Sequence, residues 1–245
     1  RLSASLALGG GLLLATALLV DRTSPYGLVP RGEGGFPLDA AYLVYFATNA
    51  AAAAFALYAP ALLQFSAGLS ALEAGYLVAV EALAWTAASL AGSGASGPWR
   101  GRLIVAGAAS IFIGAVGVTL LMNSGSLPAI GIAAAFLGAG FGLAYPHLGQ
   151  KVIGSFGMAT RARGSAAIGA VRNAGGAVGA ALAGLAANAA GFGSGLSAAN
   201  FSLIAWAAFG IGIPFAAAAL VAAVRVVRPA RTVQAGLASG ISAAA

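Results

Sequence analysis

Long apolar stretches separated by short polar gaps dominate the chain. Most reach or approach the ~20 residues that a helix needs to cross the hydrocarbon layer of a membrane. Backbone groups cannot stay unpaired in lipid, and the alternation typical of barrel strands is not seen, so helices are expected. The predicted spans are 2–20, 40–65, 74–92, 103–122, 128–150, 165–190 and 200–224. The pattern predicts an all-α polytopic membrane protein, a helical bundle with about seven transmembrane helices.

Positive charges occupy every second gap between these stretches. Ten of the twelve Lys and Arg residues are Arg22, Arg31, Arg100, Arg102, Lys151, Arg161, Arg163, Arg225, Arg228 and Arg231. The alternate gaps, around 67–73, 123–127 and 191–199, contain none. Cytoplasmic loops retain Lys and Arg whereas short translocated loops lack them. We therefore expect the first span to run from outside to inside, and the tail 225–245 to be cytoplasmic.

Composition supports a membrane protein and argues against other classes. Charged residues make up 7% of the chain and apolar residues 60%, with a mean hydropathy of +0.95, whereas soluble domains carry about 25% charged residues. No loop combines a basic run with stacking aromatics, so we expect no nucleic-acid binding despite a pI near 10.6. Eleven Arg against one Lys, with abundant Ala and Gly, is typical of GC-rich bacterial genomes. The predicted location is the bacterial inner (plasma) membrane.

One long interruption divides the chain. The segment 21–39 contains three prolines and four glycines, which exclude a regular helix through it. It is interpreted as a cytoplasmic linker between two packing units. The six later spans form two sets of three, 40–122 and 128–224. Three plus three spans of opposite topology are typical of the inverted repeats of secondary transporters.

Three stretches carry a family resemblance. Residues 58–93, YAPALLQFSAGLSALEAGYLVAVEALAWTAASLAGS, combine an aromatic-Pro-x-x-Leu-Gln run, a Gly-Leu-Ser loop, an Ala-Gly helix start and a Trp-Thr pair. This stretch resembles the seventh and eighth helices of major facilitator superfamily (MFS) transporters. FLGAGFGLAYPHLGQ (136–150) is similar to their Gly-rich tenth helix, and RARGSAAIGAVRNAGGAVGAALAG (161–184) to the loop and eleventh helix. The stretches follow one another in the family's order, and the nearest resemblance is to bacterial drug:proton antiporter-like members.

The resemblance implies a division of the chain and a function. Residues 40–224 would be the C-terminal six-helix bundle, 1–20 the last helix of a missing N-terminal bundle, 21–39 the inter-bundle linker and 225–245 a tail. The loop 93–102 keeps the arginines of the family pattern but lacks its Asp. The whole protein would move a small molecule by alternating access, as proton-coupled efflux. Its implied partners are the lipid bilayer, the substrate, protons and the missing N-terminal half.

Other functions share these features. Uptake or facilitated diffusion of a metabolite by an MFS transporter would leave the same sequence pattern. A non-transporting seven-helix receptor or scaffold would require Arg1 to lie near the natural start of the protein. A truncated, inactive transporter would insert correctly and show no activity.

Glu81 is the first candidate for chemistry. It lies in the middle of the span 74–92, where a carboxylate is costly unless it is protonated, paired or facing water. Trp85 lies one helical turn further along the same face. Glu81 is thus a proton-coupling candidate, with a structural acid paired to another helix as the alternative. Arg172, about two turns into 165–190, is a candidate charge partner or anion ligand, or it reaches the inner interface with its long side chain.

A second polar face lies on the span 40–65. Tyr42, Tyr45, Asn49, Pro60 and Gln64 share a sector of about 100° at 3.6 residues per turn. Among them Tyr45, Asn49 and Gln64 are substrate-cavity candidates together with Trp85. The alternative is that the tyrosines lie at the membrane interface while the Asn joins two helices.

Two glycine pairs have the spacing of close helix contacts. Gly138 and Gly142, and Gly175 and Gly179, are each separated by four residues. Small residues at this spacing let helix backbones approach closely in lipid. The sequence therefore predicts helix packing at both pairs.

Catalytic and metal-binding motifs are not found in the sequence. A single His and no Cys cannot supply the ligands of a typical metal site. No Ser-His-Asp arrangement, phosphate-binding loop or paired carboxylates are seen. We expect no enzymatic activity, cofactor or metal.

Overall fold

The computed structural model describes residues 35–228 together with Gly10, Thr16 and Val20, and its regular elements there are helical. The other residues of the predicted helix 1–20, most of the linker 21–39 and most of the tail 225–245 lie outside the described residues.

The helices are α2 (Leu38–Ala67), α3 (Ala71–Gly92), α4 (Pro98–Leu121), η1 (Met122–Ser124), α5 (Leu127–Gly154), α6 (Arg161–Ala189), η2 (Phe192–Ser194), α7 (Phe201–Gly210) and α8 (Gly212–Val227). Five segments of the described chain are helical, long and apolar enough to cross a membrane: α2, α3, α4 with η1, α5, and α7 with α8. The remaining long helix, α6, has the length, but its Gly, Asn and Arg content makes it less apolar. The described part of the chain is thus helical, with several helices long and apolar enough to cross a membrane.

The corner between α2 and α3 shows how the sequence ends one helix and begins the next. Gly68 terminates α2 with φ of 64°, a left-handed conformation that favours glycine. Ser70 then caps α3: its hydroxyl accepts from the Glu73 backbone N–H at 3.3 Å, and the Glu73 carboxylate accepts from the Ser70 N–H at 2.8 Å. This reciprocal capping box fixes the start of α3.

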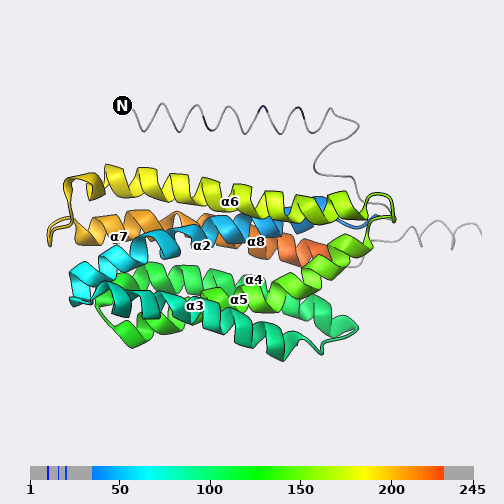
Figure 1. Ribbon diagram of the computed structural model, residues 1–245, viewed down its shortest axis with the longest axis horizontal. Helices are drawn as coiled ribbons and strands as arrows, with labels where there is room; N and C mark the ends of the chain where they lie inside the picture. Colours follow the sequence, from blue (N-terminus) through cyan, green and yellow to red (C-terminus); the bar gives the residue numbers. More distant parts are fainter. Residues whose placement is uncertain (1–9, 11–15, 17–19, 21–34, 229–245) are drawn as a thin grey trace, which may run out of the picture.

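The helices form two groups, and each group combines helices from both three-span sets. In one group α3 and α4 pack along α5, and in the other α6 and α8 pack along α2 (Figure 1). The two groups meet where α4 contacts α8. The first helix of each three-span set therefore packs against the second and third helices of the other set.

Charge is concentrated at one end of the bundle. The α3–α4 and α5–α6 connections and the end of α8 lie at the same end (Figure 1). Seven of the eight Lys and Arg residues between 35 and 228 belong to these segments, and the eighth is Arg172. The connections at the opposite end carry no Lys or Arg. This division matches the alternation read from the sequence.

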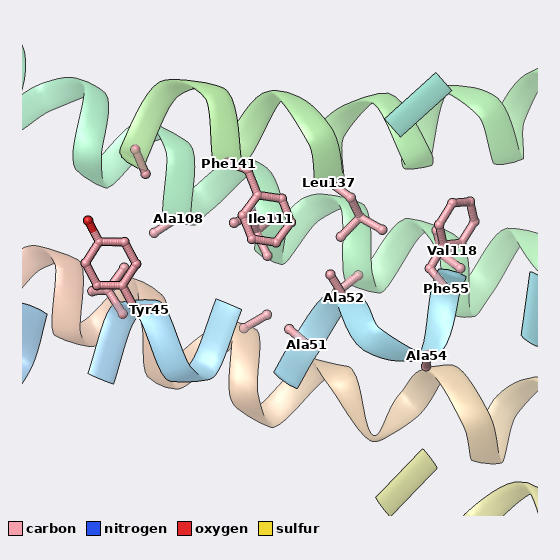
Figure 2. Packing of buried hydrophobic residues seen from close by; sticks show 14 of the residues in the cluster. Tyr45, Ala51, Ala52, Ala54, Phe55, Ala108, Ile111, Val118, Leu137 and Phe141 are labelled. Carbon is pink, nitrogen blue, oxygen red and sulfur yellow. The ribbon is translucent and has the colours of Figure 1, made fainter. Parts of the chain in front are cut away.

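Small and aliphatic side chains make up the core. Figure 2 shows side chains of α2, α4 and α5 filling the space between these helices. Phe55, Ile111 and Leu137 are at most 2% exposed, and many core positions of α2 are alanine. Lipid gives helices little hydrophobic drive to associate, so close packing of small residues stabilises the contacts.

The last predicted span, 200–224, is interrupted in the structure. A break at Ile211 separates α7 from α8, and helix continues to Val227. Pro214 lacks the backbone N–H that would bond to the carbonyl of Gly210, four residues earlier. The proline accounts for the interruption.

Candidate functional site

A buried tyrosine links α5 to α2 by hydrogen bonds. The Tyr145 hydroxyl lies 2.7 Å from Thr48 Oγ1 and 2.6 Å from Asn49 Nδ2. Thr48 donates its hydrogen to the Val44 carbonyl at 2.7 Å, so the tyrosine donates to Thr48 and accepts from Asn49. The second amide hydrogen of Asn49 bonds to the Tyr45 carbonyl at 2.8 Å. All hydrogens in this small network are used.

Aromatic rings extend the site across α5 to α3. Trp85 of α3 stacks on Phe141 with ring centroids 5.1 Å apart and planes 25° apart. Phe141 meets Tyr145 edge to face at 5.1 Å, and Tyr45 meets Tyr145 at 4.8 Å. Edge-to-face and offset contacts of this kind are the favoured aromatic geometries.

Arg172 of α6 completes the site with a positive charge. Its guanidinium lies 4.8 Å from the centroid of the Tyr145 ring and 5.8 Å from that of Trp85. The buried Nε of Arg172 has no hydrogen-bond partner among the described residues. The guanidinium thus lies over two aromatic faces, where a cation is attracted by the ring electrons.

These residues form one group, here named the Tyr145 cluster. It consists of Tyr45, Thr48, Asn49, Trp85, Phe141, Tyr145 and Arg172. Four helices, α2, α3, α5 and α6, contribute to it. Its centre is buried, whereas Asn49, Trp85 and Arg172 are half-buried. Polar and cationic groups thus reach the surface of the bundle between its ends.

Glycines bring the outer helices close enough to form the cluster. A Cβ at Gly138 would overlap with the Glu81 backbone, and one at Gly142 with the Trp85 carbonyl, so α3 lies directly on α5. On the other side, a Cβ at Gly175 would overlap with the Phe46 backbone, and one at Gly179 with that of Ala50. Both predicted glycine pairs therefore lie at helix contacts that position Trp85 and Arg172.

Glu81 lies beside the cluster without a counter-charge. It is half-buried on α3, one turn before Trp85. No hydrogen bond or ion pair joins its carboxylate to another described residue. The structure therefore does not pair Glu81 with Arg172. The two charges lie on opposite outer helices, with α2 and α5 between them.

Gln64 lies away from the other candidates. It is exposed, and its side-chain amide donates to the Pro60 carbonyl at 3.1 Å. Although Gln64 shares a helical sector with Asn49, fifteen residues at 1.5 Å each separate the two by roughly 22 Å along the axis. The structure brings Tyr45, Asn49, Trp85 and Arg172 together and leaves Gln64 out.

Three cluster residues were not singled out from the sequence: Thr48, Phe141 and Tyr145. The available signal was the placement of Tyr145 immediately before Pro146 in an otherwise apolar stretch. A hydroxyl in such a stretch needs a partner. Its identity depends on how α5 packs on α2, which no local pattern gives.

Comparison with known proteins assigns no family. No protein-family model matches the chain, and a search of curated proteins finds no match. Within the described residues, no group of three or more His, Asp or Glu side chains is placed to hold a metal ion. The functional argument therefore depends on the fold and the Tyr145 cluster.

Proposed function

We propose that the chain is part of a secondary transporter of the MFS type that moves a small molecule by alternating access. In this proposal residues 40–224 form the C-terminal six-helix bundle, and the Tyr145 cluster contributes to the substrate path. The observation that carries the proposal is the cluster itself. It is a polar, aromatic and cationic group that four helices build between the two ends of an otherwise apolar bundle.

The exchange of helices supports an inverted repeat. Suppose that α2–α4 and α5–α8 are two copies of one unit. The contact of α3 with α5 is then equivalent to the contact of α6 with α2. α4 with α5 and α8 with α2 are equivalent in the same way. The two sets start at opposite ends of the bundle (Figure 1). Repeats of opposite topology, with a binding site near the midplane, are a recurring design in transporters.

The position of the cluster favours a protein-facing or water-facing role. Lipid cannot solvate a guanidinium or an amide, so polar groups within membrane spans face the bundle interior, a cavity or another protein. Asn49, Trp85 and Arg172 are half-buried and come from three helices. A second six-helix bundle docked on this face would enclose them, with room for a substrate between the bundles.

Glu81 is the proposed proton carrier of this half. It is half-buried next to the cluster, and no ion pair joins it to another described residue. A carboxyl group in this setting is favoured in its protonated form and can release the proton when the site opens to water. Binding and release of a proton would then accompany the movement of the bundles.

Reconstitution of the full-length protein in liposomes tests both parts. Ethidium is a suitable probe because of the resemblance to drug:proton antiporters, with a pH-sensitive dye reporting protons. We expect ethidium to accumulate only under a proton gradient. Glu81→Gln should abolish ethidium-driven proton movement, and Glu81→Asp should retain part of it. Glu73→Gln is the matched control, because Glu73 is an exposed capping residue at the end of the bundle that carries no Lys or Arg.

The outcomes separate the rival functions. Proton movement that survives Glu81→Gln would remove Glu81 from the coupling. Flux of a metabolite that is indifferent to the gradient would favour facilitated diffusion. Absence of flux for every compound tried, with the protein correctly inserted, would favour a receptor, a scaffold or an inactive product. A bacterial plasma-membrane location with the charged end in the cytoplasm is part of the proposal, and reporter fusions at the C-terminus test it.

A further inference from the structure

Arginines gather on the outer side of the bundle where α4 and α8 meet at the charged end. Arg102 lies in the first turns of α4, and Arg225 and Arg228 end α8; all three are exposed. α4 and α8 touch at this level, because a Cβ on Gly101 would lie 3.4 Å from Val227 Cγ1. The start of α4, which carries Arg102, and the end of α8, which carries Arg225 and Arg228, thus lie side by side at this end of the bundle.

A shallow groove runs from Arg225 and Arg228 along α8. Leu220, Val221 and Val224 line its apolar part, and Arg225 and Arg228 line its charged end. Its volume is about 210 Å³. Val221 is 64% exposed, so the described chain leaves this part of the groove open. The groove has the polarity of a phospholipid, with a charged head and an apolar body.

The adjacent helix α4 also has an exposed face with an aromatic and a cationic side chain. Trp99, Arg102 and Ile113 share one side of this helix at helical spacing. Trp99 is 60% and Ile113 51% exposed, and the Arg102 guanidinium lies 4.7 Å from the centroid of the Trp99 ring. An exposed Trp beside an Arg is typical of the level of lipid head groups.

Among the described residues, the two helices that carry these arginines contain no acidic side chain. The described residues contain three acidic side chains, and neither α4 nor α8 carries one. Glu73 lies at the opposite end and Glu81 in mid-span, which leaves Asp39 at the start of α2. Three arginines with no carboxylate on their own helices favour an external anion.

We propose that this corner, the groove on α8 with Arg102, Arg225 and Arg228, binds one anionic phospholipid. The phosphate is held by the arginines, whose planar groups match its oxygens, and an acyl chain lies over Leu220, Val221 and Val224. Basic sites on one side of transmembrane helices recognise anionic head groups in this way. The site faces away from the Tyr145 cluster and does not depend on transport.

Trp99 is a built-in reporter for the test. The chain has three tryptophans, so Trp85→Phe with Trp206→Phe leaves Trp99 alone. The full-length protein, with any further tryptophan also replaced, is reconstituted in phosphatidylcholine containing dibrominated phosphatidylglycerol or, at equal mole fraction, dibrominated phosphatidylcholine. Bromine quenches a nearby indole. We expect stronger quenching by the anionic lipid, and a preference reduced on the order of tenfold by Arg225→Gln with Arg228→Gln.

A matched variant separates a site from general surface charge. Arg161→Gln with Arg163→Gln removes the same charge at the start of α6, at the same end of the bundle, and should leave the preference unchanged. Equal loss in the two double variants, or equal quenching by the two brominated lipids, would overturn the proposal. Displacement of the lipid by inorganic phosphate would point to a free anion instead and would also overturn it.

A second measurement keeps all tryptophans in place. Native mass spectrometry of the detergent-extracted protein should show one retained phosphatidylglycerol in the wild type and none in the Arg225→Gln and Arg228→Gln double variant. Retention of the lipid by that variant would contradict the assignment. Because this measurement does not use Trp85→Phe, it holds whether or not that substitution impairs folding.

Discussion

Two faces of the bundle differ in what they present to their surroundings. The face around the Tyr145 cluster displays an amide, an indole and a guanidinium from Asn49, Trp85 and Arg172 between the ends of the bundle. The outer face of α4 and α8 displays Ile113 and Val221 there and has arginines only at its end. In lipid, polar groups at mid-depth need partners, whereas aliphatic groups need none. The outer face is therefore suited to lipid and the cluster face to protein or water.

The largest difference in stability is expected when a carboxylate is added to the outer face and, separately, removed from the cluster face. Ile113 and Glu81 both lie near the middle of their helices, α4 and α3. Ile113→Glu places a carboxylate toward lipid, which costs about 2–3 kcal/mol. Glu81→Ile removes a carboxylate from beside the cluster and should change stability by less than about 1 kcal/mol. The fraction of folded protein during titration with SDS measures both, and equal losses would show that the faces do not differ.

The second largest loss of stability is expected when the contact between α6 and α2, which positions Arg172, is disrupted. Gly175 lies against the Phe46 backbone, whereas its neighbour Gly176 has open space around it. Gly175→Val should push α6 away from α2 and cost roughly 1–2 kcal/mol. Gly176→Val should cost no more than a few tenths. The SDS titration compares the two variants, and similar losses in both would mean that α6 is not held through Gly175.

Much of this architecture could be predicted from the sequence, because local rules govern it. Apolar length predicts the helices, Gly68 and Ser70 set a corner, and the spacing of Gly138 and Gly142 predicts a close contact. The alternation of Lys and Arg predicts which connections share an end. These features depend on residues a few positions apart.

The cluster itself could be predicted only in part. Its central hydrogen bonds join residues 96 and 97 positions apart, and no periodicity reports such a distance. The sector that groups Asn49 with Gln64 is correct around the helix axis but says nothing about distance along it. Pro214 is visible in the sequence and explains the break at Ile211. The sequence of an apolar stretch does not show, however, whether a proline bends a helix or divides it in two.

Removing one hydroxyl should weaken the cluster face by a smaller amount. Tyr145→Phe keeps the ring contacts with Phe141 and Tyr45 but leaves one Asn49 amide hydrogen without its acceptor. Hydrogen bonds between membrane helices average about 0.6 kcal/mol and reach about 1.7 kcal/mol. We expect a loss in this range in the SDS titration. Tyr76→Phe is the control, since that tyrosine is 66% exposed on α3, and a loss there equal to that of Tyr145→Phe would contradict the role of the hydroxyl.

The smallest effect should come from exchanging the cation over the rings. Arg172→Lys keeps the charge but loses the planar group that lies over Tyr145 and Trp85, at a cost of about 0.5–1 kcal/mol. Trp85 fluorescence reports the change locally when Trp99 and Trp206 are replaced by Phe. Arg225→Lys, at the outer corner, should leave this emission unchanged. The opposite result would be a Trp85 emission that Arg172→Lys leaves unchanged and Arg172→Gln shifts. Charge alone would then hold residue 172 in place, and the cluster face would differ from the outer face only by one positive charge.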